Sequence, residues 1–325
     1  MLNVRKMKFS TVAGAAMGMM LSVVVQAEAY PERPVSMIVS YSPGGATDFQ
    51  ARIVTMKATD ENYLGQPVVI LNKPGAGGKI GWDYFASRSK ADGYELAAYN
   101  VPHFIAQSIV MRTKYSIDNL EPVANWGADP AVLIVGKDSP FNTLEELVTF
   151  ARENPGKVTV SGAGLYVGHH IAFLQFAKEA GIELTYIPQS GGSDAMKSVM
   201  GAQVMAGFNN LSDAYRSQES IKILGIADLE RNEKFLPDVP TFMEKGINVD
   251  DASVNFRGIM ALKGTPPDVL DYLSERTALM LRDEGTLEKM ESGGSPVRII
   301  ERKDLVEMWK KREAYLKELL AGLKG

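Results

Sequence analysis

The sequence predicts an α/β protein of two domains, each a sheet covered by helices. Its 325 residues suit two domains at about 150 residues each. Its composition, 45% hydrophobic and 23% charged, is that of a globular protein. Short apolar, β-branched runs alternate with longer helical patterns along the chain. This alternation is typical of parallel sheets with helices on both faces.

The first domain begins with two strand–loop–helix units and a third strand. A helix is expected to begin at Thr47, because Thr47 and Gln50 have the spacing of a capping box. Asp48 adds a negative charge to its first turn, where the helix dipole favours one. A second helix is expected to run to Phe85. The expected strands are Val35–Tyr41, Val68–Leu71 and Glu95–Tyr99.

The same pattern restarts after Trp126. Thr143 and Glu146 repeat the capping-box spacing, and Trp309 is expected in the core on a long amphipathic C-terminal helix. Strands are expected at Ala131–Val135, Lys157–Ser161, Leu184–Ile187, Val204–Phe208, Ile221–Ala227 and Phe256–Leu262. Helices are expected at Thr143–Glu153, His169–Glu179, Asp194–Met200, Pro266–Arg282 and Asp304–Leu323.

Residues 1–27 are expected to be a signal peptide. A basic start precedes an uncharged, mostly apolar run from Phe9 to Ala27, which ends in small residues suited to signal peptidase. Cleavage after Ala27 removes three basic residues and no acidic one, so the net charge falls from −4 to −7. Cleavage after Ala29 is the alternative site, and a retained membrane anchor is the alternative fate. The protein is therefore expected in the periplasm.

The composition also limits the chemistry. Without cysteine there is no disulfide framework, no cysteine-ligated metal and no cysteine nucleophile. Three histidines offer little for a metal enzyme, and the acidic net charge argues against nucleic-acid binding. No metal, no cofactor and no nucleic-acid partner are expected.

Two glycine-rich loops each connect an expected strand to an expected helix: Pro43-Gly44-Gly45 and Asn72–Gly78. Open α/β sheets bind ligands at the carboxyl ends of their strands, where helix N-termini attract anions. Nucleotide motifs fail, because Lys73 stands where a P-loop needs glycine and Ile80 where a dinucleotide motif needs it. The loops therefore indicate either a carboxylate site or simple tight turns.

Several stretches match one family in order along nearly the whole chain after the leader. They are YPERPVSMIVSYSPGGATD, LGQPVVILNKPGAGGKIG, ADGYELAAYN, PQSGGSDAMKSVMGAQ and LPDVPTFMEKG. With these motifs the chain resembles the tripartite tricarboxylate transporter solute-binding proteins, also called Bug receptors.

The resemblance implies a two-lobed periplasmic-binding-protein (Venus flytrap) fold, each lobe a mostly parallel sheet flanked by helices. It implies lobe 1 from residues 28–127 and 253–325, and lobe 2 from residues 128–252. It also implies a non-catalytic, monomeric receptor that captures a small dicarboxylate or aromatic carboxylate between the lobes. The receptor would deliver this ligand to a two-subunit inner-membrane permease.

The resemblance places one ligand carboxylate on the first two loops and the other end of the ligand on loops of lobe 2. The implied ligand-binding residues are Tyr41, Ser42, Pro43, Gly44, Gly45, Thr47, Asp48, Lys73, Gly75, Ala76, Gly77, Gly78, His103, Ser161, Gly162, Tyr166, Gly168, His169, His170, Gln189, Ser190, Gly191, Asp194, Asn209 and Asn210.

Some of these residues have a plain structural alternative. Asp48 either contacts the ligand indirectly or orders its own helix, and Lys73 is either a rim charge or a solvated lysine. His170 is either a cleft residue or a structural histidine. The aromatic residues Tyr41, Phe104, Tyr166 and Phe208 either stack on an aromatic ligand or belong to the core.

Two other functions remain open from the sequence. A periplasmic hydrolase or lyase is disfavoured because no nucleophile–base motif is present. A sensory protein that presents its closed form to a membrane kinase has the same sequence features as a transport receptor, and neighbouring permease genes would separate the two.

Overall fold

The computed structural model describes residues 30–322. The expected signal peptide and its cleavage sites fall in residues 1–29 and lie outside the described residues. From Pro31 onward the described chain is one unit, and it contains the two sheets of the predicted α/β fold. None of the described helices has both the length and the apolar character that crossing a membrane requires.

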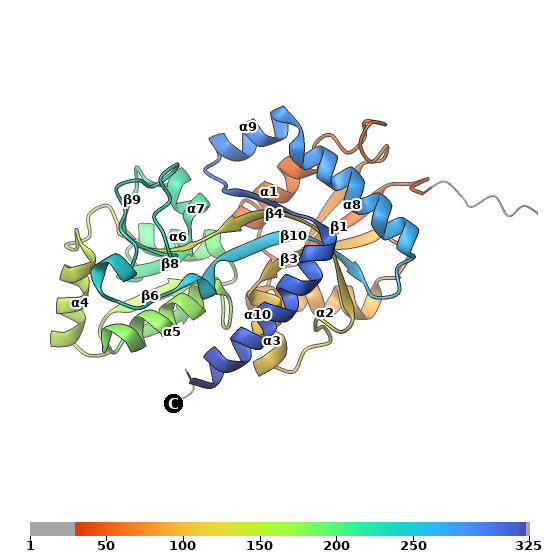
Figure 1. The fold of residues 1–325 in the computed structure, drawn as a ribbon. Helices are drawn as coiled ribbons and strands as arrows, with labels where there is room; N and C mark the ends of the chain where they lie inside the picture. The colour runs from red at the N-terminus through yellow and green to blue at the C-terminus, as the bar shows by residue number, and fades with distance from the viewer. Residues whose placement is uncertain (1–29, 323–325) are drawn as a thin grey trace, which may run out of the picture. The chain divides into compact units, whose positions relative to one another are not determined.

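The first sheet has six strands in the order β11-β4-β10-β3-β1-β2 (Figure 1). β1 pairs in parallel with β2 and with β3. β10 runs antiparallel to β3 and to β4, and β11 runs antiparallel to β4. The strands are β1 Val35–Val39, β2 Val68–Asn72, β3 Glu95–Val101, β4 Leu120–Asp129, β10 Asn255–Leu262 and β11 Val297–Ile300.

Helices cover both faces of this sheet. In one group, α1, α8 and α9 contact one another, and in the other, α3 contacts both α2 and α10. Figure 1 shows these groups above and below the strands. In the second group, Phe104 lies between Trp82 and Trp309, at ring-centroid distances of 6.2 and 4.8 Å. The helices are α1 Ala46–Val54, α2 Lys79–Arg88, α3 His103–Val110, α8 Pro267–Arg282, α9 Glu284–Ser292 and α10 Arg302–Gly322.

The second sheet has five strands in the order β7-β6-β8-β5-β9. β6 pairs in parallel with β7 and β8, whereas β5 runs antiparallel to β8 and β9. The strands are β5 Ala131–Gly136, β6 Thr159–Gly162, β7 Thr185–Pro188, β8 Ala206–Asn210 and β9 Ile221–Ala227.

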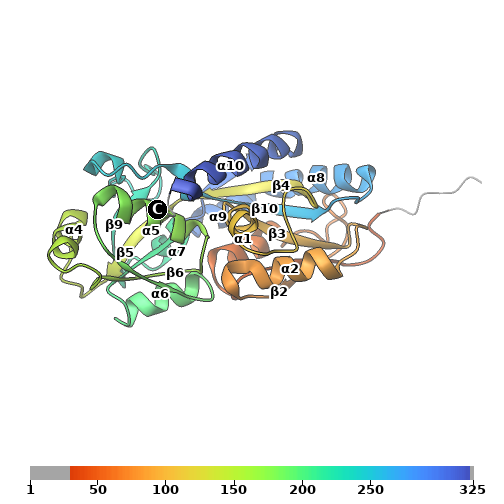
Figure 2. The ribbon, with the colours of Figure 1, turned by 90° about the horizontal axis from the view of Figure 1, so that it is seen from below.

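Helices also lie on both sides of the second sheet, as Figures 1 and 2 both show for α5 and α6. One core cluster, which includes Leu147 and Phe176, joins the sheet to α4 and α5. The other, which includes Met196 and Leu211, joins it to α6 and α7. The helices are α4 Leu144–Glu153, α5 Gly168–Ala180, α6 Gly192–Met200 and α7 Leu211–Arg216.

The chain crosses between the sheets through two connections. β4 ends at Asp129 in the first sheet and β5 begins at Ala131 in the second. The return passes through the short helix η3 (Asp251–Ser253) into β10 at Asn255. The strands next to these connections, β4, β5 and β10, run antiparallel to the strands beside them. Both sheets are therefore mixed, and the predicted parallel pairing holds only around β1 and β6. We call the parts around the two sheets the first and second lobe.

The structure confirms some of the strands, caps and helices expected from the sequence and contradicts others. Every predicted strand is present within two residues of its expected ends. The capping box at Thr143 and Glu146 forms, and Trp309 is buried. The capping box expected at Thr47 does not form, because α1 begins at Ala46 with Gly45 as its N-cap. Patterns for β4, β11, α3, α7 and α9 were missed.

Candidate functional site

A small cavity of about 20 Å³, the space of about one water molecule, lies where loops of the two lobes face each other. The first lobe contributes the β1–α1 loop, the end of β3 and the starts of α3 and β10. The second lobe contributes the loop after β6 and the starts of α5, α6 and α7. The lining residues are Tyr41, Ser42, Gly45, Ala46, Thr47, Asn100, His103, Ala163, His169, Gly192, Asn210, Asp213 and Asn255.

The β1–α1 loop brings the N-terminus of α1 to the cavity. The N-cap residue, Gly45, has no side chain that could accept hydrogen bonds from the first turn. The amides of that turn and the positive end of the helix dipole therefore face the cavity. Asp48 Oδ2 accepts from Gly44 N at 2.9 Å, and Asp48 Oδ1 accepts from Asn72 Nδ2 at 2.9 Å. Burial opposes ionisation of this carboxyl, but hydrogen bonds from Arg52, Gly44 and Asn72 outweigh it and lower its pKa. Asp48 therefore orders the loop and does not line the cavity.

The second glycine-rich loop supports the site from behind. Tyr41 Oη donates to Gly77 O at 2.9 Å, which fixes the ring that lines the cavity. Gly77 has φ of +64°, and a Cβ there would lie 2.9 Å from Val167 Cγ1 of the second lobe. The Lys73 ammonium lies 3.9 Å from the centroid of the Tyr84 ring. Lys73 does not line the cavity.

The three histidines are buried and neutral at pH 7. Burial lowers the pKa of His169 and His170 to about 4 and holds that of His103 well below its usual value. His169 Nδ1 accepts from Ala163 N at 3.1 Å, so its Nε2 carries the proton. That Nε2 is buried in the lining without a hydrogen bond to the described residues. His170 instead accepts from Tyr166 N at 3.1 Å and does not line the cavity.

Two second-lobe carboxylates reach the first-lobe loop. Ser42 Oγ donates to Asp194 Oδ2 at 3.4 Å, and Ala46 N donates to Asp213 Oδ2 at 3.4 Å. Asn210 Nδ2 also donates to Asp213 Oδ2, at 3.1 Å. Burial raises the pKa of Asp213, and the charge of Arg216 opposes that rise. The amides at the α1 N-terminus therefore already interact with one carboxylate.

A buried ion pair lies behind the cavity. Arg257 on β10 is fully buried and pairs with Asp129 at the end of β4, with Nη1 and Oδ2 2.5 Å apart. Asp129 Oδ1 also accepts from Ser212 N at 3.1 Å. Arg257 Nε donates to Thr47 Oγ1 at 3.2 Å. This ion pair thus joins β4 and β10, the strands at the two crossings. It also contacts α1 through Thr47 and α7 through Ser212.

The structure brings together part of the expected site. The expected residues that line the cavity are Tyr41, Ser42, Gly45, Thr47, His103, His169 and Asn210. Those that do not are Pro43, Gly44, Asp48, Lys73, Gly75, Ala76, Gly77, Gly78, Ser161, Gly162, Tyr166, Gly168, His170, Gln189, Ser190, Gly191, Asp194 and Asn209. Of the aromatic candidates, only Tyr41 lines the cavity, and Phe104 and Phe208 are fully buried core residues.

Four lining residues, Ala46, Asn100, Asp213 and Asn255, were not expected as ligand contacts. Asn100 and Asn255 stand at the carboxyl end of β3 and the start of β10, next to residues of ordinary strand character. The available signal was the position of Asp213 three residues after Asn210, which is the spacing of an N-cap residue and an acid in the first turn of the helix.

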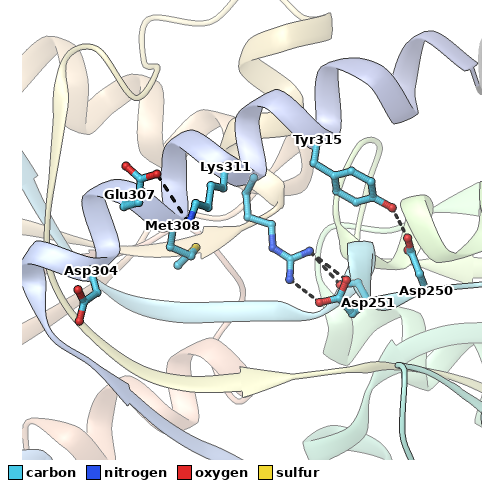
Figure 3. A pocket seen from close by; sticks show the side chains of 8 residues that line it. Asp250, Asp251, Asp304, Glu307, Met308, Lys311 and Tyr315 are labelled. Atoms are coloured by element: carbon cyan, nitrogen blue, oxygen red, sulfur yellow. Dashed lines mark hydrogen bonds and ion pairs between the residues drawn. The ribbon is translucent and has the colours of Figure 1, made fainter.

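A larger cavity of about 620 Å³ lies away from these loops, along α10. Figure 3 shows two of its pairs: Lys311 with Glu307 within α10, and Tyr315 of α10 with Asp250, the residue before η3. Arg312 Nη2 pairs with Asp251 at 2.7 Å, and Tyr315 Oη donates to Asp250. These pairs attach α10 to the connection that returns to the first lobe. Among the described residues, no three histidine or acidic side chains gather as metal ligands.

Two lobes joined by two crossing connections, with helix-terminus amides and polar side chains between them, define a two-lobed binding protein. The model of one family, the tripartite tricarboxylate transporter family receptors, matches residues 51–320. The chain belongs to this family. Members of the family are periplasmic receptors and not enzymes, which removes the hydrolase or lyase alternative.

Similar proteins agree with this assignment. BugT of Bordetella pertussis is 32% identical over 283 residues, which cover 85% of each chain. The structure of the periplasmic binding protein BugD has a TM-score of 0.84 at 29% identity and covers 91% of this chain and 99% of that one. An R. palustris protein solved with adipate has a TM-score of 0.83 at 23% identity, with 91% and 98% coverage, and shows the shared fold.

Proposed function

We propose that this chain is an exported receptor that binds a small organic carboxylate in the cavity between its lobes and delivers it to a two-subunit inner-membrane permease. The observation that carries the proposal is the N-terminus of α1, which has no N-cap side chain and whose Ala46 amide meets the Asp213 carboxylate at a cavity lined by both lobes. Such a terminus binds anions through its free amides and its dipole. The adipate held by a protein of the same fold supports a carboxylate ligand.

The remaining parts of the proposal concern the chain's organisation. Residues 1–27 are a signal peptide, and the protein acts as a monomer in the periplasm. Lobe 1 comprises residues 28–127 and 253–325, and lobe 2 comprises residues 128–252. Sheet membership supports this division, because β4 and β10 belong to one sheet and β5 and β9 to the other.

Ligand binding requires the lobes to separate and close again. The cavity of about 20 Å³ is much smaller than a carboxylic acid of several carbons, and contacts such as Ser42 Oγ to Asp194 Oδ2 join its two sides. A ligand favours the closed form only through contacts with both lobes. The residues that line the cavity make these ligand contacts. Asp48 and Gly77 do not line it but hold its loops in place through their hydrogen bonds to Gly44 and Tyr41.

The test is calorimetry and thermal shift with dicarboxylates, aromatic carboxylates and small monocarboxylic acids. A true ligand at 100 times its Kd raises the unfolding free energy by about 2.7 kcal/mol. Gly45→Val is expected to abolish binding, because Gly45 lines the cavity. The variant is expected to fold, because a Cβ at this position lies 3.6 Å from Ser42 O, an ordinary van der Waals distance. Gly322→Val, at the exposed end of α10, is the matched control. Binding by Gly45→Val as tight as by the control would contradict the site.

A further inference from the structure

We infer that the ligand carries, besides its carboxylate, an ammonium group at the end that meets the second lobe, and that Asp213 is the residue that selects it. This inference rests on the proposed function and narrows its ligand class. A carboxylate at the first lobe and an ammonium at the second make a zwitterion. A dicarboxylate of the same length lacks the ammonium.

Asp213 presents a carboxylate oxygen to the cavity. The residue lies in the first turn of α7, which follows Asn210, and it is 7% exposed. Its Oδ1 pairs with Arg216, so that oxygen is directed to a cation of its own helix. Its Oδ2 faces the first lobe and accepts from Ala46 N of that lobe at 3.4 Å, and it also accepts from Asn210 Nδ2 of its own lobe at 3.1 Å. An ionised carboxylate only accepts hydrogen bonds, so Oδ2 suits a donor on the ligand.

The described lining contains no cation that could receive a second carboxylate. Arg216 is directed away from the cavity, since its Nη1 donates to Gly293 O at 2.9 Å and its guanidinium lies 4.4 Å from the Phe49 ring centroid. Arg257 is held by Asp129. A second carboxylate at this end would lie beside Asp213 without a compensating charge, which is unfavourable in a buried site.

Asn100 is a second polar residue of the same lining, and its amide nitrogen donates to Thr47 Oγ1 at 2.9 Å.

The test compares matched pairs of acids by calorimetry on the mature protein. 3-Aminopropanoate is compared with succinate, and 4-aminobutanoate with glutarate, because each pair differs only in the group at one end. The wild type is expected to bind the amino acid of at least one pair ten-fold or more tighter than its partner. Asp213→Asn is expected to remove that preference, because the amide keeps the shape of the side chain and loses its charge.

Asp228→Asn is the control variant, because Asp228 is a partly buried acid of the second lobe outside the lining. It should keep the wild-type preference. Equal or tighter binding of the dicarboxylates by the wild type overturns the inference and leaves the proposed function intact. An unchanged preference in Asp213→Asn also overturns it. If Asp213→Asn does not fold, the wild-type comparison decides alone. Binding of none of these acids, nor of any in the wider panel, rejects the proposed function together with the inference.

Discussion

Replacing Arg257 by methionine tests the buried ion pair behind the cavity. Methionine keeps much of the volume of the arginine stem and removes the guanidinium. Asp129, which is 1% exposed, then remains buried without its cation. Its contacts with Ser212 N and Ser212 Oγ persist, but two neutral hydrogen bonds do not replace a full charge.

The expected cost is about 3–5 kcal/mol of unfolding free energy, the range for removing one partner of a buried pair. Two lost hydrogen bonds, from Arg257 to Thr47 at 3.2 Å and to Gln50 at 3.4 Å, are long and add little. Combining the change with Asp129→Asn should recover part of the loss, because the unpaired charge is then removed as well.

Urea unfolding followed by circular dichroism measures this change through the midpoint and the slope. Arg231→Met is the matched control, since Arg231 pairs with Glu244 at 2.9 Å on the surface. Exposed pairs contribute about 0–1 kcal/mol. If Arg257→Met costs no more than Arg231→Met, the pair does not stabilise the junction of the lobes, and this reasoning is refuted.

Three further predictions concern stability. Because burial lowers the pKa of His169 to about 4, the unfolded chain binds a proton between pH 6.5 and 4 that the folded chain does not. His169 should therefore contribute about 1.4 kcal/mol per pH unit to the fall in unfolding free energy as pH decreases through that window, beside the contributions of His103 and His170, and His169→Gln should reduce the slope by about that amount; an unchanged slope would contradict the burial argument. Trp309→Ala should cost about 3–5 kcal/mol in urea unfolding, since the ring is 2% exposed and packs on Phe104; a cost below 1 kcal/mol would argue against this packing. Thr143→Ala should cost about 1 kcal/mol by losing the capping box, and Thr143→Ser should restore most of it.

Regular local signals in the sequence predicted most of the fold. The alternation of apolar strands with capped helices located elements such as β5 and α4, because burial of one face imposes a period on the sequence. β4 was missed because Pro122, Asn125 and Gly127, which are residue types common in turns, lie within its span and break the strand pattern. Its pairing with β10, more than a hundred residues later, defines it as a strand.

The candidate site was only half predictable for a related reason. Gly45 and Thr47 follow a strand within one recognisable loop, so their place was visible in the sequence. For Asp48 the sequence left indirect ligand contact and ordering of its own helix open, and the structure shows its carboxylate accepting a hydrogen bond from Gly44 N. Asp213 and Asn255 come to the cavity from α7 and from the return crossing, and no local pattern connects them with Gly45.

The sequence by itself determined the two α/β sheets, the glycine-rich loop at the N-terminus of α1 and the family, because each depends on residues that are close together along the chain. The tertiary structure decided which side chains share the cavity. It brought the carboxylate of Asp213 to the amide of Ala46, placed Arg257 against Asp129, and left Lys73 and His170 outside the lining. These contacts join residues that are far apart in the sequence. The free energy of each depends on the cost of removing the charged groups from water and on the gain from pairing them, and both are determined only by the packing of the folded chain.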